Sequence, residues 1–217
     1  MTFKILPSLL SADPLRLGQE VDAVLQGQAD MLHLDIMDNH YVPNLTYGPG
    51  VCQALSHYAP TIPVDVHLMV SPVDELITQF ATAGAARISI HPDATIHLDR
   101  SLQLIQEYRC QAGLALNPAT SLDSLEWIIH RLDFILIMTV NPGFGGQTLI
   151  PEVINKITHI HTRYPHLPLC VDGGITVDNI ASLAKAGATE FVAGQAIFKS
   201  KDYQKTMQLM RQRLSQS

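Results

Sequence analysis

LHLDIM, residues 32–37, has the aliphatic composition of a buried β-strand, yet it also carries an imidazole and a carboxylate. Side chains in a strand alternate between two faces, so His33, Asp35 and Met37 share one face and the aliphatic residues share the other. A wholly apolar face is typical of a parallel strand that packs against helices. The stretch therefore predicts a parallel strand whose other face gathers polar groups.

The same kind of apolar run, followed by a stretch of helical period, recurs along the chain to give eight pairs. This alternation is typical of βα units and a parallel sheet. We predict strands at Phe3–Leu6, Met31–Ile36, Val64–Leu68, Ala86–Ile90, Ala112–Ala115, Phe134–Met138, Leu167–Val171 and Glu190–Val192. We predict helices at Pro14–Leu25, Gly48–Tyr58, Val73–Ala83, Ile96–Tyr108, Ser121–Arg131, Pro151–Arg163, Val177–Ala186 and Tyr203–Leu214.

Several helix ends carry their own signals. Asp13 followed by Pro14 is typical of an N-cap and a first helical residue, and Gly84 and Gly187 stand where helices end.

Eight βα pairs predict an α/β fold, a (β/α)₈ TIM barrel that spans residues 1–217 as one domain. A doubly wound open sheet is the alternative, because the number of strands alone does not close a barrel.

Composition limits the function classes. The chain has 217 residues, of which 47% are hydrophobic and 16% charged, as in a globular protein with a large core. It contains neither a secretory signal pattern nor about 18 consecutive apolar residues, so we expect a cytoplasmic protein without a membrane partner. A formal charge of −6 argues against nucleic acid as a partner. The three cysteines are widely spaced, which argues against both a disulfide framework and a cysteine metal site.

Polar side chains recur where predicted strands end. VDVHLMV, residues 64–70, places Asp65, His67 and Met69 on one face, and LCVDGG, residues 169–174, ends a strand with Asp172. In a parallel barrel the carboxyl ends of the strands meet at one mouth, so His33, Asp35, His67 and Asp172 should converge. Any one of them alone is better explained as a hydrogen-bonded core residue, but four together are expensive to bury without a shared partner.

A divalent cation accounts for such a set. Imidazole and carboxylate ligands together suit zinc first, with iron, cobalt or manganese as alternatives, and imidazole argues against magnesium and calcium. The histidines of HIHTRYPH, residues 159–166, lie in the back half of a predicted helix and in the loop that follows it, so we do not assign them to this site. The other histidines, which we interpret as ordinary surface or packing residues, are His40, His57, His91, His97 and His130.

Glycines follow three successive strands. They occur in NPGFGGQ (residues 141–147), DGG (172–174) and AGQ (193–195), after the sixth, seventh and eighth strands. Each alone is explained by a tight βα turn, but together, at one end of a barrel, they favour a phosphate site built from backbone N–H groups. The nucleoside triphosphate motif GxxxxGK[ST] is absent from the sequence.

The motifs resemble one known family. HLDIMDNHYVPNLTYGP, DVHLMV, MTVNPGFGGQ, CVDGGI and VAGQAIF, with PSLLSAD near the start, closely resemble the ribulose-phosphate 3-epimerases over about Lys4 to Phe198. The resemblance implies a barrel of the ribulose-phosphate-binding type that interconverts D-ribulose 5-phosphate and D-xylulose 5-phosphate in the pentose phosphate pathway. It also implies a small sugar phosphate as the partner and assembly as a homo-oligomer.

The resemblance also implies residue roles. It makes His33, Asp35, His67 and Asp172 the metal ligands, and Asp35 and Asp172 the acid/base pair. It favours Met37, Met69 and Met138 as a wall over an enediolate intermediate, where spacing alone leaves them equally well explained as core residues. The positions that match the family's substrate contacts or adjoin them are Ser8, His67, Gly143, Phe144, Gly145, Gly146, Asp172, Gly173, Gly174, Gly194 and Gln195.

Two residues depart from the family pattern. Gln195 stands where a serine is usual, which puts a hydroxyl contact to the phosphate in doubt, and Leu149 stands where an aromatic residue is usual. An epimerase for D-allulose 6-phosphate is the alternative activity, because it would use the same metal and aspartates. A decarboxylase or lyase would call for a lysine near the strand ends, and none stands in these motifs. A non-catalytic sensor would not need both aspartates.

Overall fold

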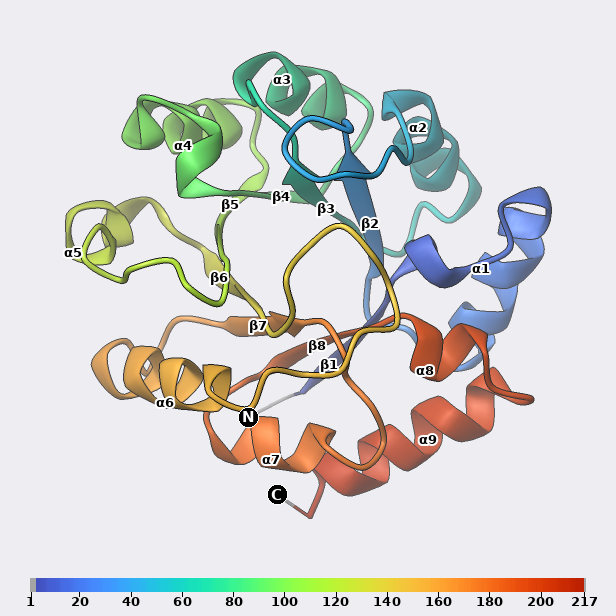
Figure 1. The fold of residues 1–217 in the computed structure, drawn as a ribbon. Helices are drawn as coiled ribbons and strands as arrows, with labels where there is room; N and C mark the ends of the chain where they lie inside the picture. The colour runs from blue at the N-terminus through green and yellow to red at the C-terminus, as the bar shows by residue number, and fades with distance from the viewer. Residues whose placement is uncertain (1–2, 217) are drawn as a thin grey trace.

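The computed structural model describes residues 3–216. Its sheet has eight strands, every neighbouring pair of which is parallel, and helices surround it (Figure 1). The strands are β1 (Lys4–Pro7), β2 (Leu32–Met37), β3 (Val64–Met69), β4 (Arg87–Ile90), β5 (Gln111–Leu116), β6 (Phe134–Met138), β7 (Leu169–Asp172) and β8 (Glu190–Ala193). All eight predicted strands are present, with bounds that differ from the predicted ones by at most two residues at either end.

The strand order is that of a barrel. Strands consecutive in sequence are neighbours from β2 to β8, and β8 pairs with β1. The last gap, between β1 and β2, is bridged where Ser8 pairs with His33 in parallel. A doubly wound sheet would reverse its order at a switch point, which this order does not do. The barrel prediction is confirmed, and the open-sheet alternative is wrong.

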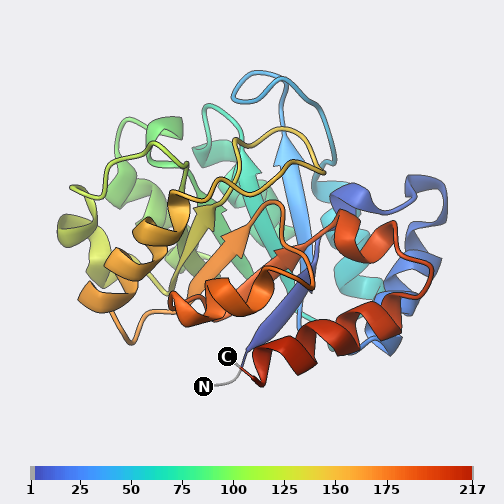
Figure 2. The ribbon, with the colours of Figure 1, turned by 60° about the horizontal axis from the view of Figure 1, so that its bottom comes forward.

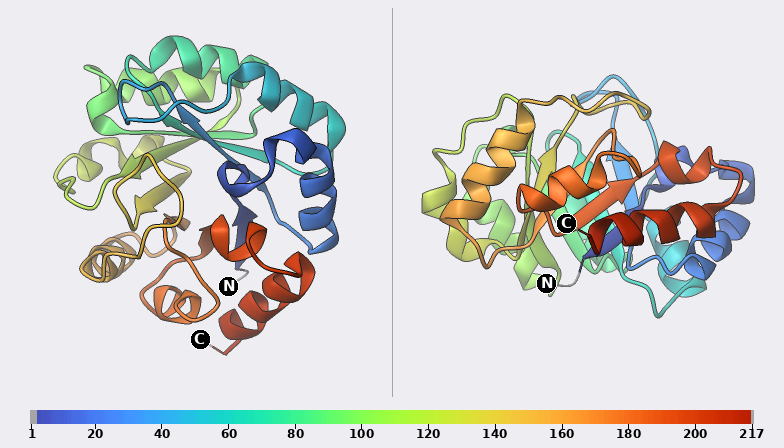
Figure 3. Two further views of the ribbon diagram at one scale, coloured as in Figure 1. Left: turned by 45° about the vertical axis from the view of Figure 1, so that its right-hand side comes forward. Right: turned by 90° about the horizontal axis from the view of Figure 1, so that it is seen from below.

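The helices follow the strands around the outside of the ring (Figure 3). The α-helices are α1 (Leu17–Gln26), α2 (Pro49–Tyr58), α3 (Asp74–Thr82), α4 (Leu98–Glu107), α5 (Leu125–Ile128), α6 (Val153–Arg163), α7 (Ile180–Lys185), α8 (Gln195–Phe198) and α9 (Tyr203–Leu214). Short 3₁₀ helices are η1 (Leu9–Ser11), η2 (Pro14–Arg16), η3 (Pro92–Ala94) and η4 (Ile129–Arg131). No helix within residues 3–216 is both long enough and apolar enough to cross a membrane.

One predicted helix needs correction, and the structure has one helix, α8, that the sequence pattern does not predict. The predicted helix at Ser121–Arg131 begins only at Leu125, because Ser121 and Asp123 hydrogen-bond each other in a local turn. Helix α8 has four residues, too few to give a periodic signal. Other ends match their signals: the Asp13 carboxylate accepts from the Leu15 N–H ahead of α1.

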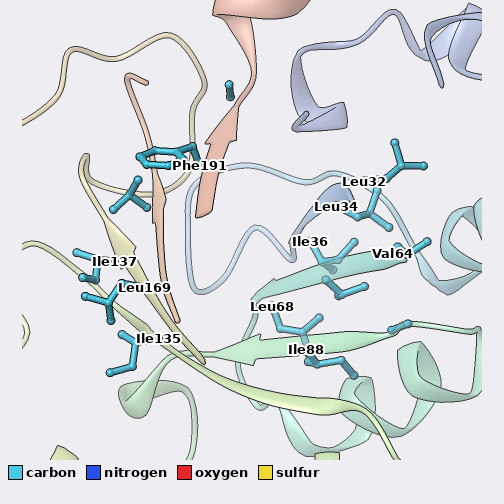
Figure 4. Packing of buried hydrophobic residues seen from close by; sticks show 14 of the residues in the cluster. Leu32, Leu34, Ile36, Val64, Leu68, Ile88, Ile135, Ile137, Leu169 and Phe191 are labelled. Carbon is cyan, nitrogen blue, oxygen red and sulfur yellow. The ribbon is translucent and has the colours of Figure 1, made fainter. Parts of the chain in front are cut away.

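Most of the buried apolar side chains form two layers. The larger lies between the strands and the helices, where Leu34 and Ile36 of β2 pack beside Leu68 of β3 and Ile88 of β4 (Figure 4). The smaller lies inside the barrel and includes Leu6, Met31, Ala115, Phe134, Leu136, Met138, Cys170 and Val192. Polar groups can therefore gather only at the mouth, or inside the barrel with partners of their own.

Two long loops stand over the carboxyl ends of the strands. In Figures 1 and 2 the loops that follow β2 and β6 rise at the same end of the barrel. They are joined where the Asn44 side-chain amide donates to the carbonyl oxygen of Gly143, at 2.9 Å. The fold thus encloses the mouth where the sequence predicts the functional residues.

Candidate active site

The four predicted ligand residues converge at the mouth of the barrel. His33 and Asp35 come from β2, His67 from β3 and Asp172 from the end of β7. One ligand atom from each side chain lies within 4.8 Å of all the others. Within residues 3–216 this is the one group of three or more such side chains placed to hold a metal ion, and the histidines of residues 159–166 lie outside it.

His33 is held on both sides of its ring. Its Nδ1 lies 2.8 Å from Oδ2 of Asp65, and its Nε2 faces the cluster, 3.3 Å from Oδ1 of Asp35. The side chain is fully buried. Burial lowers the pKa of His33, but the charges of Asp35 and Asp65 outweigh this and hold it well above its usual value.

His67 presents the opposite nitrogen. Its Nδ1 faces the cluster, 3.3 Å from Oδ1 of Asp35, and its Nε2 lies 2.8 Å from Nε2 of His91. Burial lowers the pKa of His67, and the nearby Asp35 carboxylate does not offset this. The ring is therefore neutral at pH 7, which is the form that ligates metals.

The two aspartates have opposite charge preferences. Burial raises the pKa of Asp35, but the charges and hydrogen bonds of His33 and His67 outweigh it and hold the pKa far below its usual range. Burial raises the pKa of Asp172 to about 7, with the charge of Asp35 adding to the effect and that of His33 opposing it. At neutral pH Asp35 is ionised, whereas Asp172 titrates.

The distances among these groups fit a divalent cation. Ligand atoms around a tetrahedral zinc ion lie about 3.3 Å apart when each bond is about 2.0 Å long. Oδ1 of Asp35 lies 3.3 Å from the facing nitrogens of both His33 and His67, and Oδ2 of Asp172 lies 3.7 and 3.9 Å from them. These separations are long for hydrogen bonds but short enough for shared ligands. The donor set suits zinc, iron, cobalt or manganese.

A cavity of about 310 Å³ opens above the cluster. Asp35 and Asp172 line it, whereas His33 and His67 lie behind them, fully buried. The predicted substrate and wall residues that line it are Ser8, Met37, Met69, Met138, Gly143, Phe144, Gly145, Gly146, Gly173, Gly174, Gly194 and Gln195. Ser8 donates to Oδ2 of Asp35 at 2.6 Å, which fixes that carboxylate.

The glycine loops meet along one side of this cavity. Gly174 has φ +65, and a Cβ there would lie 2.6 Å from the backbone nitrogen of Leu149, so the β6 and β7 loops touch through their backbones. The Gln195 side chain lies against Gly146. A Cβ added at Gly146 would lie 2.4 Å from Nε2 of Gln195. The structure thus brings the three loops together, with Gln195 among them.

Comparison with known proteins agrees with these features. The family described as the ribulose-phosphate 3 epimerase family matches residues 4–198. The chain is 51% identical to the ribulose-phosphate 3-epimerase of Escherichia coli K12, over 98% of this chain and 96% of that one. It is 53% identical to the enzyme of the same name from Serratia marcescens, over 94% of this chain and 99% of that one.

The chain belongs to the ribulose-phosphate 3-epimerase family. Two solved structures of low sequence identity share the fold of this epimerase-family chain. KGPDC from Streptococcus mutans has a TM-score of 0.75 at 14% identity and covers 100% of this chain and 99% of its own. The 3-hexulose-6-phosphate synthase of Salmonella typhimurium has a TM-score of 0.74 at 16% identity, covering 98% and 99%.

Two residues of this epimerase-family site have contacts that the sequence did not reveal. Asp65 bonds His33, although alternation indicates only that it shares a face with His67. His91, which the sequence suggests is a surface or packing residue, is fully buried and contacts His67. It directly follows β4, two residues after Ser89, so the alternation that locates Asp35 offered a signal for His91 as well.

Proposed function

We propose that this chain is a metal-assisted ribulose-phosphate 3-epimerase that interconverts D-ribulose 5-phosphate and D-xylulose 5-phosphate. The observation that carries the proposal is a pair of carboxylates, Asp35 and Asp172, that line one cavity with pKa values shifted in opposite directions. The family to which the chain belongs, and relatives at about half identity, support the pentulose rather than the hexulose substrate.

Two acid/base groups are what this reaction needs. Inverting a carbon next to a carbonyl requires loss of its proton on one face and return of a proton on the other. Asp35, ionised at neutral pH, is ready to accept a proton, and Asp172, with a pKa of about 7, is ready to donate one. The two exchange these roles when the reaction runs in the opposite direction.

His33, Asp35, His67 and Asp172 are the residues that would hold the cation, which we propose to be zinc, with iron, cobalt or manganese as alternatives. When bound, the cation supplies Lewis-acid stabilisation of the negative charge that develops on the substrate oxygens. The two histidines would thus serve binding of the cation alone, whereas the two carboxylates would serve both binding and proton transfer.

The surrounding residues orient the substrate and exclude water. Met37, Met69 and Met138 line the cavity and supply an apolar, polarizable wall beside the two aspartates. Ser8 holds the Asp35 carboxylate through a hydrogen bond of 2.6 Å and faces the same cavity. We propose that this wall shields the enediolate from water during proton transfer.

The phosphate group would lie on the glycine loops. Backbone N–H groups of Gly145, Gly146, Gly174 and Gly194 supply uncharged donors to a phosphate at this side of the cavity. The remaining predicted contacts there are Gly143, Phe144 and Gly173. Gln195 lies against Gly146, so its amide takes the place that a serine hydroxyl usually has in the family. Gln195→Ser should change KM for the phosphorylated sugar and leave kcat close to that of the original chain.

Assembly is a separate proposal. The family resemblance supports a homo-oligomer, and large apolar side chains such as Leu15, Ile96 and Trp127 are exposed on the described chain. Sedimentation equilibrium would test this, because a monomer mass at micromolar concentration contradicts the proposal.

The direct test measures how fast the purified, metal-loaded protein converts each of the two sugar phosphates. We expect D-ribulose 5-phosphate to yield D-xylulose 5-phosphate with a much higher kcat/KM than D-allulose 6-phosphate yields its C3 epimer. Asp35→Asn and Asp172→Asn are the matched controls, because each keeps the side-chain shape and removes the acid/base group. A preference for the hexulose phosphate, or conversion of neither substrate, would contradict the proposal.

A further inference from the structure

His91 lies behind the ligand cluster. It directly follows β4 and is fully buried, with its ring between those of His67 and Tyr41 at centroid distances of 5.0 and 4.9 Å. Its Nε2 is 2.8 Å from Nε2 of His67. The proposed mechanism does not use this side chain.

The short contact restricts where the protons sit. Two imidazole nitrogens 2.8 Å apart form a hydrogen bond only when one carries the proton and the other accepts it. A neutral His67 has a single ring proton, and its Nδ1 faces Asp35 and Asp172. A cation held there needs the Nδ1 lone pair, so the proton of His67 must lie on Nε2. His91 must then accept through its own Nε2 and carry its proton on Nδ1.

Packing alone does not explain a histidine at this position. The Nδ1 atom of His91 is buried and has no hydrogen-bond partner among the described residues. A buried polar atom without a partner destabilises the fold, and an apolar residue of similar size would avoid this loss. Among the described residues, the hydrogen bond that the His91 side chain makes is the one to His67.

We propose that His91 is a positioning residue for His67: its Nε2 accepts a hydrogen bond from the Nε2–H of His67 and so keeps the Nδ1 lone pair of His67 directed at the ligand cluster. This inference rests on the metal site of the proposed function. The two histidine ligands are then supported differently, because His33 is oriented by the Asp65 carboxylate and His67 by a neutral imidazole. Partners behind metal ligands fix both ring orientation and tautomer.

The test compares zinc affinity among variants of the full chain. His91→Phe keeps a ring of similar size without an acceptor, and His91→Gln offers a side-chain oxygen in its place. Ser89→Ala is the matched control, because Ser89 is buried on β4, two residues before His91, and pairs in register with His67, but its side chain is not hydrogen-bonded to His67. In competition with a chromophoric chelator, we expect His91→Phe to bind zinc about 10–100-fold more weakly. His91→Gln and Ser89→Ala should stay within a few-fold of the original chain, and excess zinc should restore the kcat of His91→Phe.

A second readout needs no substitution. Nitrogen-15 NMR of histidine-labelled, zinc-loaded protein should place the proton of His67 on Nε2 and that of His91 on Nδ1. Any other protonation pattern overturns the inference, as does equal zinc affinity in folded His91→Phe and the original chain. If the original chain binds no zinc, iron, cobalt or manganese, the metal site of the proposed function fails, and this inference fails with it. The NMR result decides the question even if His91→Phe does not fold.

Discussion

Arg87 is the residue whose removal should most affect the barrel interior. It is 1% exposed, and its Nε lies 2.8 Å from Oδ1 of Asp65 while its Nη1 donates to Glu190. Its guanidinium lies 4.1 Å from the ring centre of Phe134. Asp65 in turn bonds His33, so the ion pair supports a side chain of the candidate active site. We expect Arg87→Met to destabilise the fold and to weaken metal binding.

The magnitude follows from the partners that remain. Removing one member of a buried ion pair costs about 3–5 kcal/mol, because the other charge stays buried without compensation. Here Glu190 keeps Lys4 and Asp65 keeps His33. We therefore expect the lower part of the range, about 3 kcal/mol. For a chain of this size each kcal/mol shifts Tm by about 2–4 °C, so Tm should fall by about 6–12 °C.

Thermal unfolding followed by circular dichroism measures this loss. Arg163→Met is the matched control, because Arg163 pairs with Glu126 at 2.8 Å but both side chains are about half exposed, at 54% and 48%. An exposed pair contributes about 0–1 kcal/mol, so its loss should change Tm by only a few degrees. Equal Tm changes in the two variants would refute the reasoning that burial makes the Arg87 pair important.

Three further predictions concern the active site. Asp35→Asn and Asp172→Asn should each remain folded and lose about 10²-fold or more in kcat, and near-normal turnover by both would contradict the two-aspartate mechanism. Chelation should abolish turnover, and zinc, iron, cobalt or manganese should restore it, whereas recovery with magnesium alone would contradict the ligand assignment. In the metal-free protein the folded pKa of Asp172, about 7, lies above its ordinary value of 3.8, so the folded state keeps a proton that the unfolded state loses between these pH values. The contribution of Asp172 to the free energy of unfolding therefore falls as pH rises from about 4 to 7. Urea unfolding of the two metal-free proteins measures this effect. The free energy of unfolding of Asp172→Asn, relative to that of the original chain, should be higher at pH 8 than at pH 4. An equal difference at both pH values would contradict the raised pKa.

The fold could be predicted because each strand and long helix carries its own period. LHLDIM shows the alternation that separates a helix-facing side from a barrel interior, and the strand it predicts has the expected faces. Local hydrogen bonds and short elements are where the prediction fails. Ser121 and Asp123 make a turn within an apparently helical stretch, and α8 is too short for periodicity to register.

The site could be predicted as far as alternation and strand ends reach. His33, Asp35, His67 and Asp172 converge because parallel strands place their carboxyl ends at one mouth. Contacts behind the cluster depend on strand tilt and on ring orientation, which the sequence pattern does not specify. Hence the contacts of Asp65 with His33 and of His91 with His67 emerge from the folded arrangement.

The most direct test of the proposed reaction is proton NMR of metal-loaded protein in deuterated water with D-ribulose 5-phosphate. Proton removal and return at C3 by Asp35 and Asp172 should introduce deuterium at C3 as D-xylulose 5-phosphate forms. Asp172→Asn, folded and metal-loaded, should show this exchange at least about 10²-fold more slowly. Formation of D-xylulose 5-phosphate without deuterium at C3, or no exchange with any of zinc, iron, cobalt and manganese, would contradict the proposal.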